Sequence, residues 1–489
     1  MICVFYNIYF RVYIYLNISC WYEEVILLVI QMKILFITEG FFIEPLGIMQ
    51  LSGCLKKAGH KTDLITTEED YESKIKEWKP KIVAYSVMTG NHKTFVELNN
   101  KLKSKFDFVS LFGGPHATFF KDLIEEDGVD VVCMGEGDEA IVELVDKLDK
   151  NEDIKNINNL NVKKDGVVYR NSVRSLIEDL DSLPFPDRDI VMKYDKIKND
   201  PIKHFVAGRG CPFNCKYCFN EKYAKVYEGK GKRVRWRSVD NLIEEIKEVN
   251  EKYPTKVNYF QDDTFILDKE WLKEFCERYK EINLPFHCHV RANLVDEEIV
   301  KMLKEANCYS VHIAAETADD KIRNEVLNRN MSKEEILNAC KLLRKHKIKF
   351  MMQNMIGLPG GSLKKDIETL KLNIKCKPTY AWVSIFQPYP GTELEKYCRE
   401  NGYVEDLDYD NIGSNFYERS LLKIEDRKKV EHLQRWFAYV VDKPFLYYSG
   451  LLNFFISFPK WKGLNRWYKG VYQNFRDKKD YELFGVELK

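Results

Sequence analysis

The sequence has almost no net charge, because 76 Lys and Arg side chains offset 75 Asp and Glu side chains and leave a formal charge of +1. This balance excludes a general electrostatic attraction to nucleic acid or to an acidic membrane, and no nucleic-acid partner is expected. Hydrophobic residues form 45% of the chain and charged residues 31%, which is typical of a globular protein. At 489 residues, about two to four domains are expected.

The first 31 residues contain neither a good signal peptide nor a convincing membrane span. No basic region precedes an apolar core there, and Asn7, Arg11 and Asn17 interrupt the hydrophobic stretch. Met32 begins a short basic-then-apolar strand, so the favoured interpretation of residues 1–31 is an extension that results from a mis-assigned start codon. The alternative is an interfacial segment that lies on a membrane.

A disulfide framework is absent as well, because the 13 cysteines are odd in number and scattered, so a reducing cytoplasm is the expected location. Cys211, Cys215 and Cys218 form a C-x3-C-x2-C motif. Three thiolates from one tight loop can hold three irons of a [4Fe–4S] cluster and leave one iron open for an outside ligand. The alternative is a zinc knuckle closed by His204 or another cysteine, but no second C-x2-C pair follows at zinc-ribbon distance. We therefore expect these three cysteines to be the metal ligands and the catalytic residues.

With Tyr217 before its third cysteine, the motif resembles the signature of the radical S-adenosylmethionine (SAM) superfamily. The resemblance implies that the open iron chelates the amino and carboxylate groups of SAM. An electron from the cluster then cleaves the sulfonium to give methionine and a 5′-deoxyadenosyl radical. It also implies an external electron donor such as flavodoxin or ferredoxin, and an oxygen-labile cluster that requires a reducing compartment.

Residues 32–150 alternate short apolar runs with amphipathic segments, which predicts an α/β domain with a parallel sheet wound by helices. A helix is expected between the first two strands and ends at Gly59. This pattern is Rossmann-like, and such sheets bind ligands beyond the carboxyl ends of their strands. The predicted strands are Lys33–Ile37, Lys61–Thr66, Lys81–Val87, Phe108–Phe112 and Asp130–Cys133.

Short glycine-rich segments follow these strands and together resemble the cobalamin (B12)-binding domain that precedes the catalytic domain in cobalamin-dependent radical SAM enzymes. No G-x-G-x-x-G motif with a downstream ribose-binding acid is present, which disfavours a dinucleotide site. The cobalamin contacts that the resemblance implies are Ser86, Thr89, Gly113, Gly114, His116, Gly135 and Gly137.

None of the nine histidines lies in a D-x-H-x-x-G pattern, which in related domains places a histidine on cobalt. The resemblance therefore implies cobalamin bound without a protein histidine, its lower face left to solvent or a neighbouring side chain. His116 follows a Gly-Pro turn, where a histidine is more often a loop hydrogen-bonder than a ligand. A cobalamin-binding sensor can carry the same domain, but the cysteine triplet argues against a sensor.

Residues 151–200 are interpreted as a linker that wraps between two domains, and residues 201–403 repeat strand and helix six times. This repeat predicts an open, partial β/α barrel that resembles the radical SAM core, with its chemistry at the carboxyl ends of the strands. The predicted strands are His204–Ala207, Lys256–Gln261, Phe286–Val290, Ser310–Ala315, Ile348–Asn354 and Ala381–Phe386.

Residues at these strand ends are the expected SAM contacts. Asp262 and Asp263 form a carboxylate pair suited to the ammonium group of SAM, whereas Asp268 is better placed to cap the following helix. Arg291 can bind a carboxylate bidentately or make a surface ion pair. The further SAM contacts that the resemblance implies are Tyr217, Glu316, Arg329, Gln353 and Gly357.

Two remaining segments receive structural interpretations. Acidic residues flank the basic loop 230–237, so it is interpreted as a solvated barrel loop rather than a phosphate or nucleic-acid contact. Residues 404–489 are rich in aromatics and are predicted to form a helical C-terminal domain that closes the open barrel and helps shape the substrate pocket, with a packing annex as the alternative. Residues 451–458 resemble an interfacial face, which would suit a lipid substrate and peripheral membrane contact.

The resulting prediction is a cobalamin-dependent radical SAM methyltransferase that acts on an unactivated carbon of a small-molecule or lipid substrate. In the mechanism that the resemblance implies, cob(I)alamin takes a methyl group from one SAM. A second SAM yields the radical that removes a substrate hydrogen, and the substrate radical collects the methyl group from methylcobalamin. The alternatives are oxidation, cyclisation or rearrangement by an enzyme of the same family and, as a distant third, a cobalamin sensor.

Overall fold

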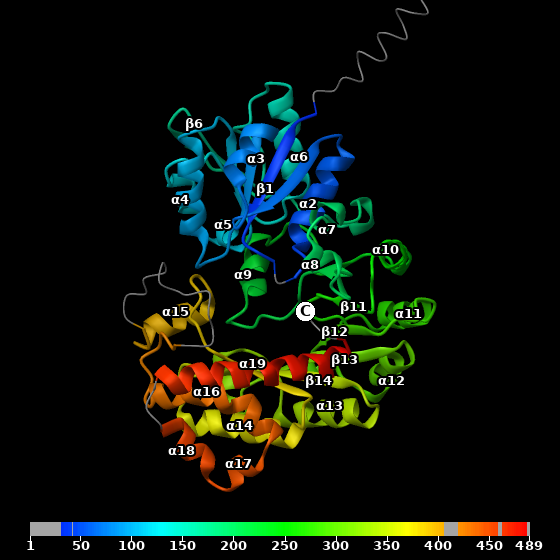
Figure 1. Cartoon of the computed structure of the whole chain (residues 1–489), viewed down its shortest axis with the longest axis vertical. Coiled ribbons are helices and arrows are strands. Elements are labelled where there is room, and N and C mark those ends of the chain that lie inside the picture. The colour runs from blue at the N-terminus through cyan, green and yellow to red at the C-terminus, as the bar shows by residue number, and fades with distance from the viewer. Residues whose placement is uncertain (1–30, 42, 405–418, 458–461, 487–489) are drawn as a thin grey trace, which may run out of the picture.

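The computed structural model describes residues 31–41, 43–404, 419–457 and 462–486. The two interpretations of residues 1–31 therefore fall almost entirely outside the described residues. Figure 1 shows two stacked bodies, with the N-terminal sheet and its helices above and the second sheet below. The helices at the C-terminal end of the chain cover the lower body.

The N-terminal sheet has seven strands in the order β2-β1-β3-β4-β5-β6-β7. The predicted strands are confirmed to within one residue at each end, and all five run parallel. They are β1 (Lys33–Thr38), β2 (Lys61–Thr66), β3 (Ile82–Ser86), β4 (Val109–Gly113) and β5 (Val131–Cys133). The intervening and following helices are α2 (Leu46–Lys57), α3 (Tyr71–Trp78), α4 (His92–Lys103), α5 (Pro115–Phe119) and α6 (Asp138–Asp149).

Two strands of this sheet come from the segment interpreted as a linker. β6 (Leu160–Lys164) pairs antiparallel with β5, and β7 (Val167–Tyr169) pairs antiparallel with β6. The short helices α7 (Asp189–Met192) and α8 (Asp195–Lys198) then lead to the second body. The first part of the linker segment thus extends the N-terminal sheet, and its later part joins the two bodies.

The second body is a parallel sheet of six strands in the order β15-β14-β13-β12-β11-β8. β8 and β15 are its two edges, so the barrel is open, as predicted. The strands are β8 (Ile202–Phe205), β11 (Val257–Phe260), β12 (Phe286–Val290), β13 (Cys308–Glu316), β14 (Lys349–Ile356) and β15 (Tyr380–Ile385). The helices between them are α9 (Phe219–Val226), α10 (Val239–Lys252), α11 (Lys269–Tyr279), α12 (Glu297–Glu305), α13 (Lys333–Lys345) and α14 (Leu363–Cys376).

Local sequence signals account for several of these helix starts. Asp268 caps α11 as predicted, because its side chain accepts a hydrogen bond from the backbone N–H of Trp271 at 3.0 Å. Ser332 and Glu335 form a complete capping box at α13. Each cap fixes where a barrel helix begins and so sets the length of the strand-end loop before it.

The described part of residues 404–489 is helical, as predicted, and contains α16 (Arg427–Asp442), α17 (Phe445–Tyr448), α18 (Leu451–Ser457) and α19 (Lys462–Phe484). Helix α15 (Glu393–Glu400) precedes this region and follows β15. The end of α19 places Phe484 and Leu483 in one buried cluster with Ile202 and Val257, at the amino ends of the barrel strands. The C-terminal region therefore closes the end of the barrel opposite the strand ends where the cofactor residues are expected.

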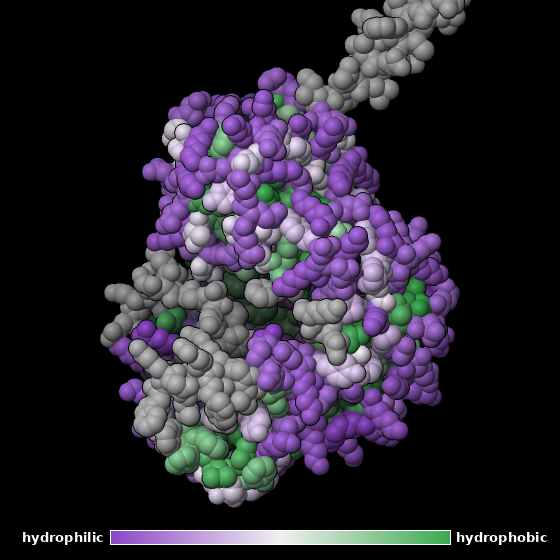
Figure 2. Space-filling model, viewed as in Figure 1, coloured by the Kyte–Doolittle hydropathy of each residue, from purple (hydrophilic) through white to green (hydrophobic). Residues whose placement is uncertain are grey.

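None of the described helices is long and apolar enough to cross a membrane. Helices α17 and α18 expose Phe445, Tyr448, Leu451 and Phe454, and Figure 2 shows hydrophobic surface gathered at the end of the molecule where α17 lies. The interfacial interpretation of this segment stays a prediction.

Arg188 joins the two bodies through buried ion pairs. Its guanidinium lies 2.9 Å from Glu44, in the loop before α2, and 2.9 Å from Glu245 of α10. It also donates a hydrogen bond to the backbone oxygen of His204 at 2.7 Å. All three charged side chains are at most 6% exposed, so water cannot replace a lost partner.

Replacing Arg188 with Met should lower the free energy of unfolding by about 3–5 kcal/mol, because Glu44 loses a buried counter-charge and Glu245 loses one of two. The control is Arg170→Met, since Arg170 is 41% exposed and pairs with Asp122 and Glu125 at the surface. Its loss should change stability by roughly 0–1 kcal/mol. Urea denaturation of both variants measures the difference, and equal effects would contradict the buried-network account.

Candidate active site

The cysteine loop follows β8 and the short strand β9 (Gly208–Arg209) and is fixed to the barrel by backbone hydrogen bonds. The N–H of Lys216 donates to the carbonyl of Leu327 at 3.1 Å, and the N–H of Leu394 donates to the carbonyl of Lys216 at 2.9 Å. The side-chain amide of Asn328 donates to the carbonyl of Asn214 at 2.7 Å. The loop that carries all three cysteines is therefore held from the far side of the barrel mouth.

Gly210, directly before the first cysteine, has a φ of +90°, and a Cβ at this position would collide with the carbonyl of Arg233. The Arg233 guanidinium in turn donates to the side chain of Asn214 at 2.6 Å and to the carbonyl of Phe213 at 2.8 Å. Glycine is thus required where the cysteine loop passes close to the backbone of Arg233.

The three thiols are suited to metal ligation. Cys215 is buried, whereas Cys211 and Cys218 are partly accessible. Burial raises the pKa of the Cys218 thiol to about 11 and also raises the pKa of Cys211, so a metal has to displace their protons on binding. The Arg291 guanidinium lies 3.7 Å from the Cys215 sulfur and so places a positive charge beside the cysteine loop. Three thiols on one fixed loop beside a cation fit an iron–sulfur cluster.

Arg291 does not make the surface ion pair that was one of its two sequence interpretations. It is buried, its guanidinium stacks 3.7 Å from the ring centre of Phe213, and it donates to the carbonyl of Arg329. The β12 strand end points inward at this position, so the arginine faces the cysteine loop and not solvent. The direction of the Arg291 side chain depends on how the strands of the barrel align, which a single sequence does not fix.

Three predicted SAM contacts meet at the end of β13. The Tyr217 hydroxyl donates to Glu316 at 2.8 Å, and Arg329 donates to the Tyr217 hydroxyl at 2.6 Å and to Glu316 at 3.3 Å. Arg329 also donates to the carbonyl of Ala314 at 2.9 Å. Burial raises the pKa of Tyr217, so this hydroxyl stays protonated and keeps the Glu316 carboxylate in place. A fixed carboxylate at the barrel mouth can accept hydrogen bonds from hydroxyl groups of a ligand.

The predicted aspartate pair is divided between two kinds of contact. The Asp262 carboxylate accepts hydrogen bonds from the backbone N–H groups of Ala207, at 3.1 Å, and Gly208, at 2.6 Å. Its burial raises its pKa to about 7. Asp262 therefore shapes the turn that leads into the cysteine loop. Asp263 lies on the same cavity wall, and desolvation raises its pKa as well.

Gln353 lies on β14 in register with Ala314 of β13, and Gly357 follows the end of β14. Gly357 has a φ of +68° and donates its N–H to Asp366 at 3.2 Å. A Cβ on Gly357 would lie 3.3 Å from Ile424, so packing against the C-terminal region also favours glycine here. The expected SAM contacts of Gln353 and Gly357 stay predictions.

A cavity of about 530 Å³ lies between the two bodies, within the usual range for ligand pockets. Its lining residues all fall between Phe36 and Asp263, so the described C-terminal region does not line it. The wall from the N-terminal sheet includes several glycines and a serine at strand ends, where the backbone is open to close approach by a large flat cofactor. The predicted residues that line it are Ser86, Gly113, Gly114, Gly135, Gly137, Asp262 and Asp263.

Thr89 and His116 are predicted cobalamin contacts that do not line this cavity. The Thr89 hydroxyl lies 3.0 Å from His116 Nδ1. The His116 ring is stacked between His92, at 3.8 Å, and Phe120, at 4.4 Å. His116 is therefore a buried loop hydrogen-bonder, as the turn context suggested.

The basic loop is only partly solvated. Gly231 and Lys232 are exposed, whereas Arg235 and Arg237 are buried, so the interpretation of residues 230–237 as a solvated loop was wrong for its second half. Arg235 is buried and pairs with Glu136 of the N-terminal body at 2.8 Å. Arg209, which pairs in sheet register with Arg235, makes a bidentate contact with Asp138, at 2.9 Å for both nitrogens. Arg235 is neutralised by an acid of the other body, whereas Arg237 pairs with Glu245 of α10, so the local sequence gave no sign of the burial of either.

Tyr227, which follows α9, is a docking residue that the sequence did not reveal. Its hydroxyl accepts hydrogen bonds from the backbone N–H of Glu136 at 2.8 Å and from Asn159 at 3.1 Å. Gly135 has a φ of +72°, and a Cβ there would occupy the position of the Tyr227 hydroxyl. Because α9 begins directly after Cys218, this contact fixes the cysteine loop relative to the N-terminal body.

Comparison with known proteins agrees with both predicted resemblances. The radical SAM superfamily model matches residues 205–372, and the B12 binding domain model matches residues 32–145. An uncharacterized methyltransferase of Pyrococcus horikoshii is 30% identical over 375 residues, which cover 74% of this chain and 79% of the relative. The chain belongs to the cobalamin-dependent radical SAM enzymes. Enzymes of this class use a [4Fe–4S] cluster, SAM and cobalamin.

More distant relatives differ in reaction. A cytidylyl-2-hydroxyethylphosphonate methyltransferase of Streptomyces wedmorensis is 22% identical, with 74% of this chain and 79% of the relative covered. An anaerobic magnesium-protoporphyrin IX monomethyl ester cyclase of Cereibacter sphaeroides is 27% identical, with 75% and 61% covered. The fold resembles that of TsrM, a radical SAM methyltransferase of Kitasatospora setae whose structure contains cobalamin and a [4Fe–4S] cluster. The TM-score is 0.62 at 15% sequence identity, and the match covers 76% of this chain and 75% of that one.

Replacing Cys215 with Ala should abolish the [4Fe–4S] cluster, because two thiolates remain where three irons need ligands. The matched control is Cys398→Ala, which removes a buried cysteine of α15 and should leave about four irons per chain after anaerobic reconstitution. Iron counting and the visible absorption spectrum measure both. A Cys215 variant with the full cluster would rule out this ligand set.

Cob(II)alamin bound to the protein should show no nitrogen splitting from an axial ligand in its electron paramagnetic resonance spectrum. The physical reason is that His116 is held by Thr89 and stacked between two rings away from the cavity lining. The spectrum of His116→Ala should be the same as that of the unmodified protein. A nitrogen splitting that disappears in this variant would instead make His116 the cobalt ligand.

Proposed function

We propose that this chain is a methyltransferase that transfers a methyl group from cobalamin to an unactivated carbon of a small-molecule substrate. The observation that carries the proposal is the shared cavity. The strand-end glycines Gly113 and Gly137 of the cobalamin domain line the same space as Gly210 and Asp263 of the barrel. One substrate bound there can reach a methyl donor on one wall and the radical-generating side on the other.

When bound, the cluster and SAM supply a hydrogen-abstracting radical and cobalamin supplies the methyl group. The roles of the chain's own residues are to bind, orient and exclude water. We assign the SAM ammonium group to Asp263, because both Asp262 oxygens already accept backbone hydrogen bonds. Glu316, held by Tyr217 and Arg329, is suited to the ribose hydroxyls.

The ion pairs at the cavity wall support a closed reaction space. Arg209 and Arg235 of the barrel hold Glu136 and Asp138 of the cobalamin domain against them. Such contacts limit the exchange of solvent and confine reactive species to the cavity, which reduces side reactions. The substrate must therefore enter by a path that this interface leaves open.

The second candidate function is oxidation or cyclisation without methyl transfer. It is favoured by the similarity to the anaerobic cyclases, one of which is 27% identical to this chain over 388 residues. A cobalamin sensor is disfavoured, because a sensor has no use for the three cysteines and the arginine fixed around them.

A reducing cytoplasm and an external one-electron donor such as flavodoxin or ferredoxin belong to the same proposal. Eleven cysteines lie in the described part of the chain, and all are free there. Free thiols and an oxygen-labile cluster both suit a reducing compartment. The electron donor is required because cleavage of SAM consumes one electron that the protein itself does not supply.

The reaction type is tested with SAM labelled at its methyl carbon and a candidate substrate. The candidates are compounds that the enzymes encoded by neighbouring genes make or use. Methyl transfer should place the label in the product and release 5′-deoxyadenosine and S-adenosylhomocysteine in equal amounts, because one SAM is cleaved and another donates its methyl group. Mass spectrometry of the product and chromatography of both nucleosides measure these quantities.

The Cys215→Ala variant is the control for this assay, since it should form no 5′-deoxyadenosine with any substrate. Product that forms together with 5′-deoxyadenosine, but without label and without S-adenosylhomocysteine, would contradict methyl transfer. That result would establish the oxidative or cyclising alternative.

A further inference from the structure

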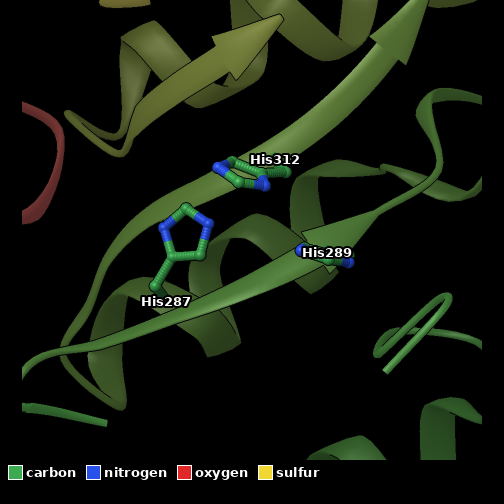
Figure 3. A group of neighbouring side chains, drawn as sticks. All are labelled: His287, His289 and His312. Carbon is green, nitrogen blue, oxygen red and sulfur yellow. The ribbon is translucent and has the colours of Figure 1, made fainter. Parts of the chain in front are cut away.

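Three histidines from two neighbouring barrel strands meet inside the barrel. His287 and His289 lie on β12, and His312 lies on β13 in register with His289. Alternate residues of a strand point to the same face, so His287 and His289 both face the interior and Cys288 faces the other way. One ring nitrogen from each histidine lies within 4.8 Å of the others, and Figure 3 shows the three side chains converging.

The hydrogen bonds among these rings are incomplete. His287 Nδ1 lies 2.6 Å from the Ser310 hydroxyl, and the Tyr259 hydroxyl lies 2.9 Å from His289 Nε2 and 3.1 Å from His312 Nδ1. The Nε2 atoms of His287 and His312 are buried and have no hydrogen-bond partner. His287 is fully buried and His312 is 8% exposed, so these two nitrogens lack both a protein partner and ready access to water. Unpaired buried polar atoms are unfavourable unless a ligand satisfies them.

The chemistry of this set matches a transition metal. Imidazole nitrogen suits Zn²⁺, Fe²⁺, Ni²⁺ and Cu²⁺, whereas Mg²⁺ and Ca²⁺ prefer carboxylate and carbonyl oxygens, and the group contains no carboxylate. Metal-ligating histidines must be neutral and usually donate their other N–H to a fixed partner. Ser310 is such a fixed partner for His287.

We propose that His287, His289 and His312 form a binding site for a divalent transition-metal ion, Zn²⁺ being the expected one, separate from the [4Fe–4S] cluster. Three protein nitrogens leave the fourth position of a tetrahedral zinc site open. The Tyr259 hydroxyl, already in contact with two of the rings, is an available ligand for it. A water molecule is the other.

A metal at this site would help to fix the position of Arg291, which contacts a cysteine of the cluster loop. Arg291 directly follows the last residue of β12, two residues and about 7 Å beyond His289, and its guanidinium contacts the Cys215 sulfur. On the other side, Phe484 of α19 packs against His287 with ring centres 4.9 Å apart. A metal between these layers would fix β12, and with it Arg291, to β13 and to the C-terminal closure of the barrel.

The test measures zinc in the full-length protein with its cluster in place. Purified protein is dialysed against Zn²⁺ and then against metal-free buffer, and zinc is counted per chain by mass spectrometry. We expect about one zinc per chain, with X-ray absorption distances of about 2.0–2.1 Å to nitrogen or oxygen. Zinc taken up instead by cluster cysteines would give sulfur at about 2.3 Å.

The variants are His289→Gln and His312→Gln, each expected to weaken zinc binding at least tenfold in competition with a chelator. The matched control is His204→Gln, which removes a buried histidine of the same barrel interior that hydrogen-bonds Gln261 and is outside the group. It should keep its zinc. Cluster absorption retained in all three variants shows that they are folded.

Several results would overturn the proposal. They are the absence of stoichiometric zinc in the unmodified protein, sulfur ligands in its absorption spectrum, or equal zinc loss in His204→Gln and His289→Gln. In those cases the three rings form only a packed core around Tyr259. The spectrum of the unmodified protein decides the ligand type even if a variant fails to fold, and none of these measurements depends on methyl transfer.

Discussion

The charged contacts between the two bodies are the constraint on which the rest of the site depends. Arg188, Arg209 and Arg235 each reach an acid of another segment, and all three contacts lie at the cavity between the bodies. A buried charge without its partner costs several kcal/mol, roughly 3–5 by experience with broken pairs. Bidentate arginine contacts also fix orientation, which apolar contacts do not. The two bodies are therefore held in one relative arrangement, and the cavity has one shape.

That arrangement places the cysteine loop beside the cobalamin domain. Helix α9 starts after Cys218, and Tyr227 beyond its end binds the turn that contains Gly135 and Glu136. The loop is thus tied to the barrel at one end and to the other domain at its other end. A catalyst that uses two reactive centres needs this rigidity, because a misplacement of about 1 Å can cost a factor of about a hundred in rate.

The barrel interior contains polar side chains at two places, one beside the cysteine loop and one deeper inside. Strand β12 carries His287 and His289 on one face inside the barrel, and Arg291, directly after the strand, lies near the cysteine loop. An aliphatic core would hold the strand equally well at lower desolvation cost. Three adjacent imidazoles in that place therefore call for a ligand, and the unpaired Nε2 atoms are the physical sign of it.

The sequence by itself determined the parallel strands of both sheets, the cap at Asp268 and the cysteine triplet, because each depends on residues close together in the chain. Only the tertiary structure decided which distant groups meet. β6 and β7 pair onto the first sheet, Arg235 finds Glu136, and His312 joins the two histidines of β12, although H-x-H in a strand already signals two rings on one face. These pairings depend on strand register and domain docking, which arise from the free energy of the whole fold and leave no local pattern.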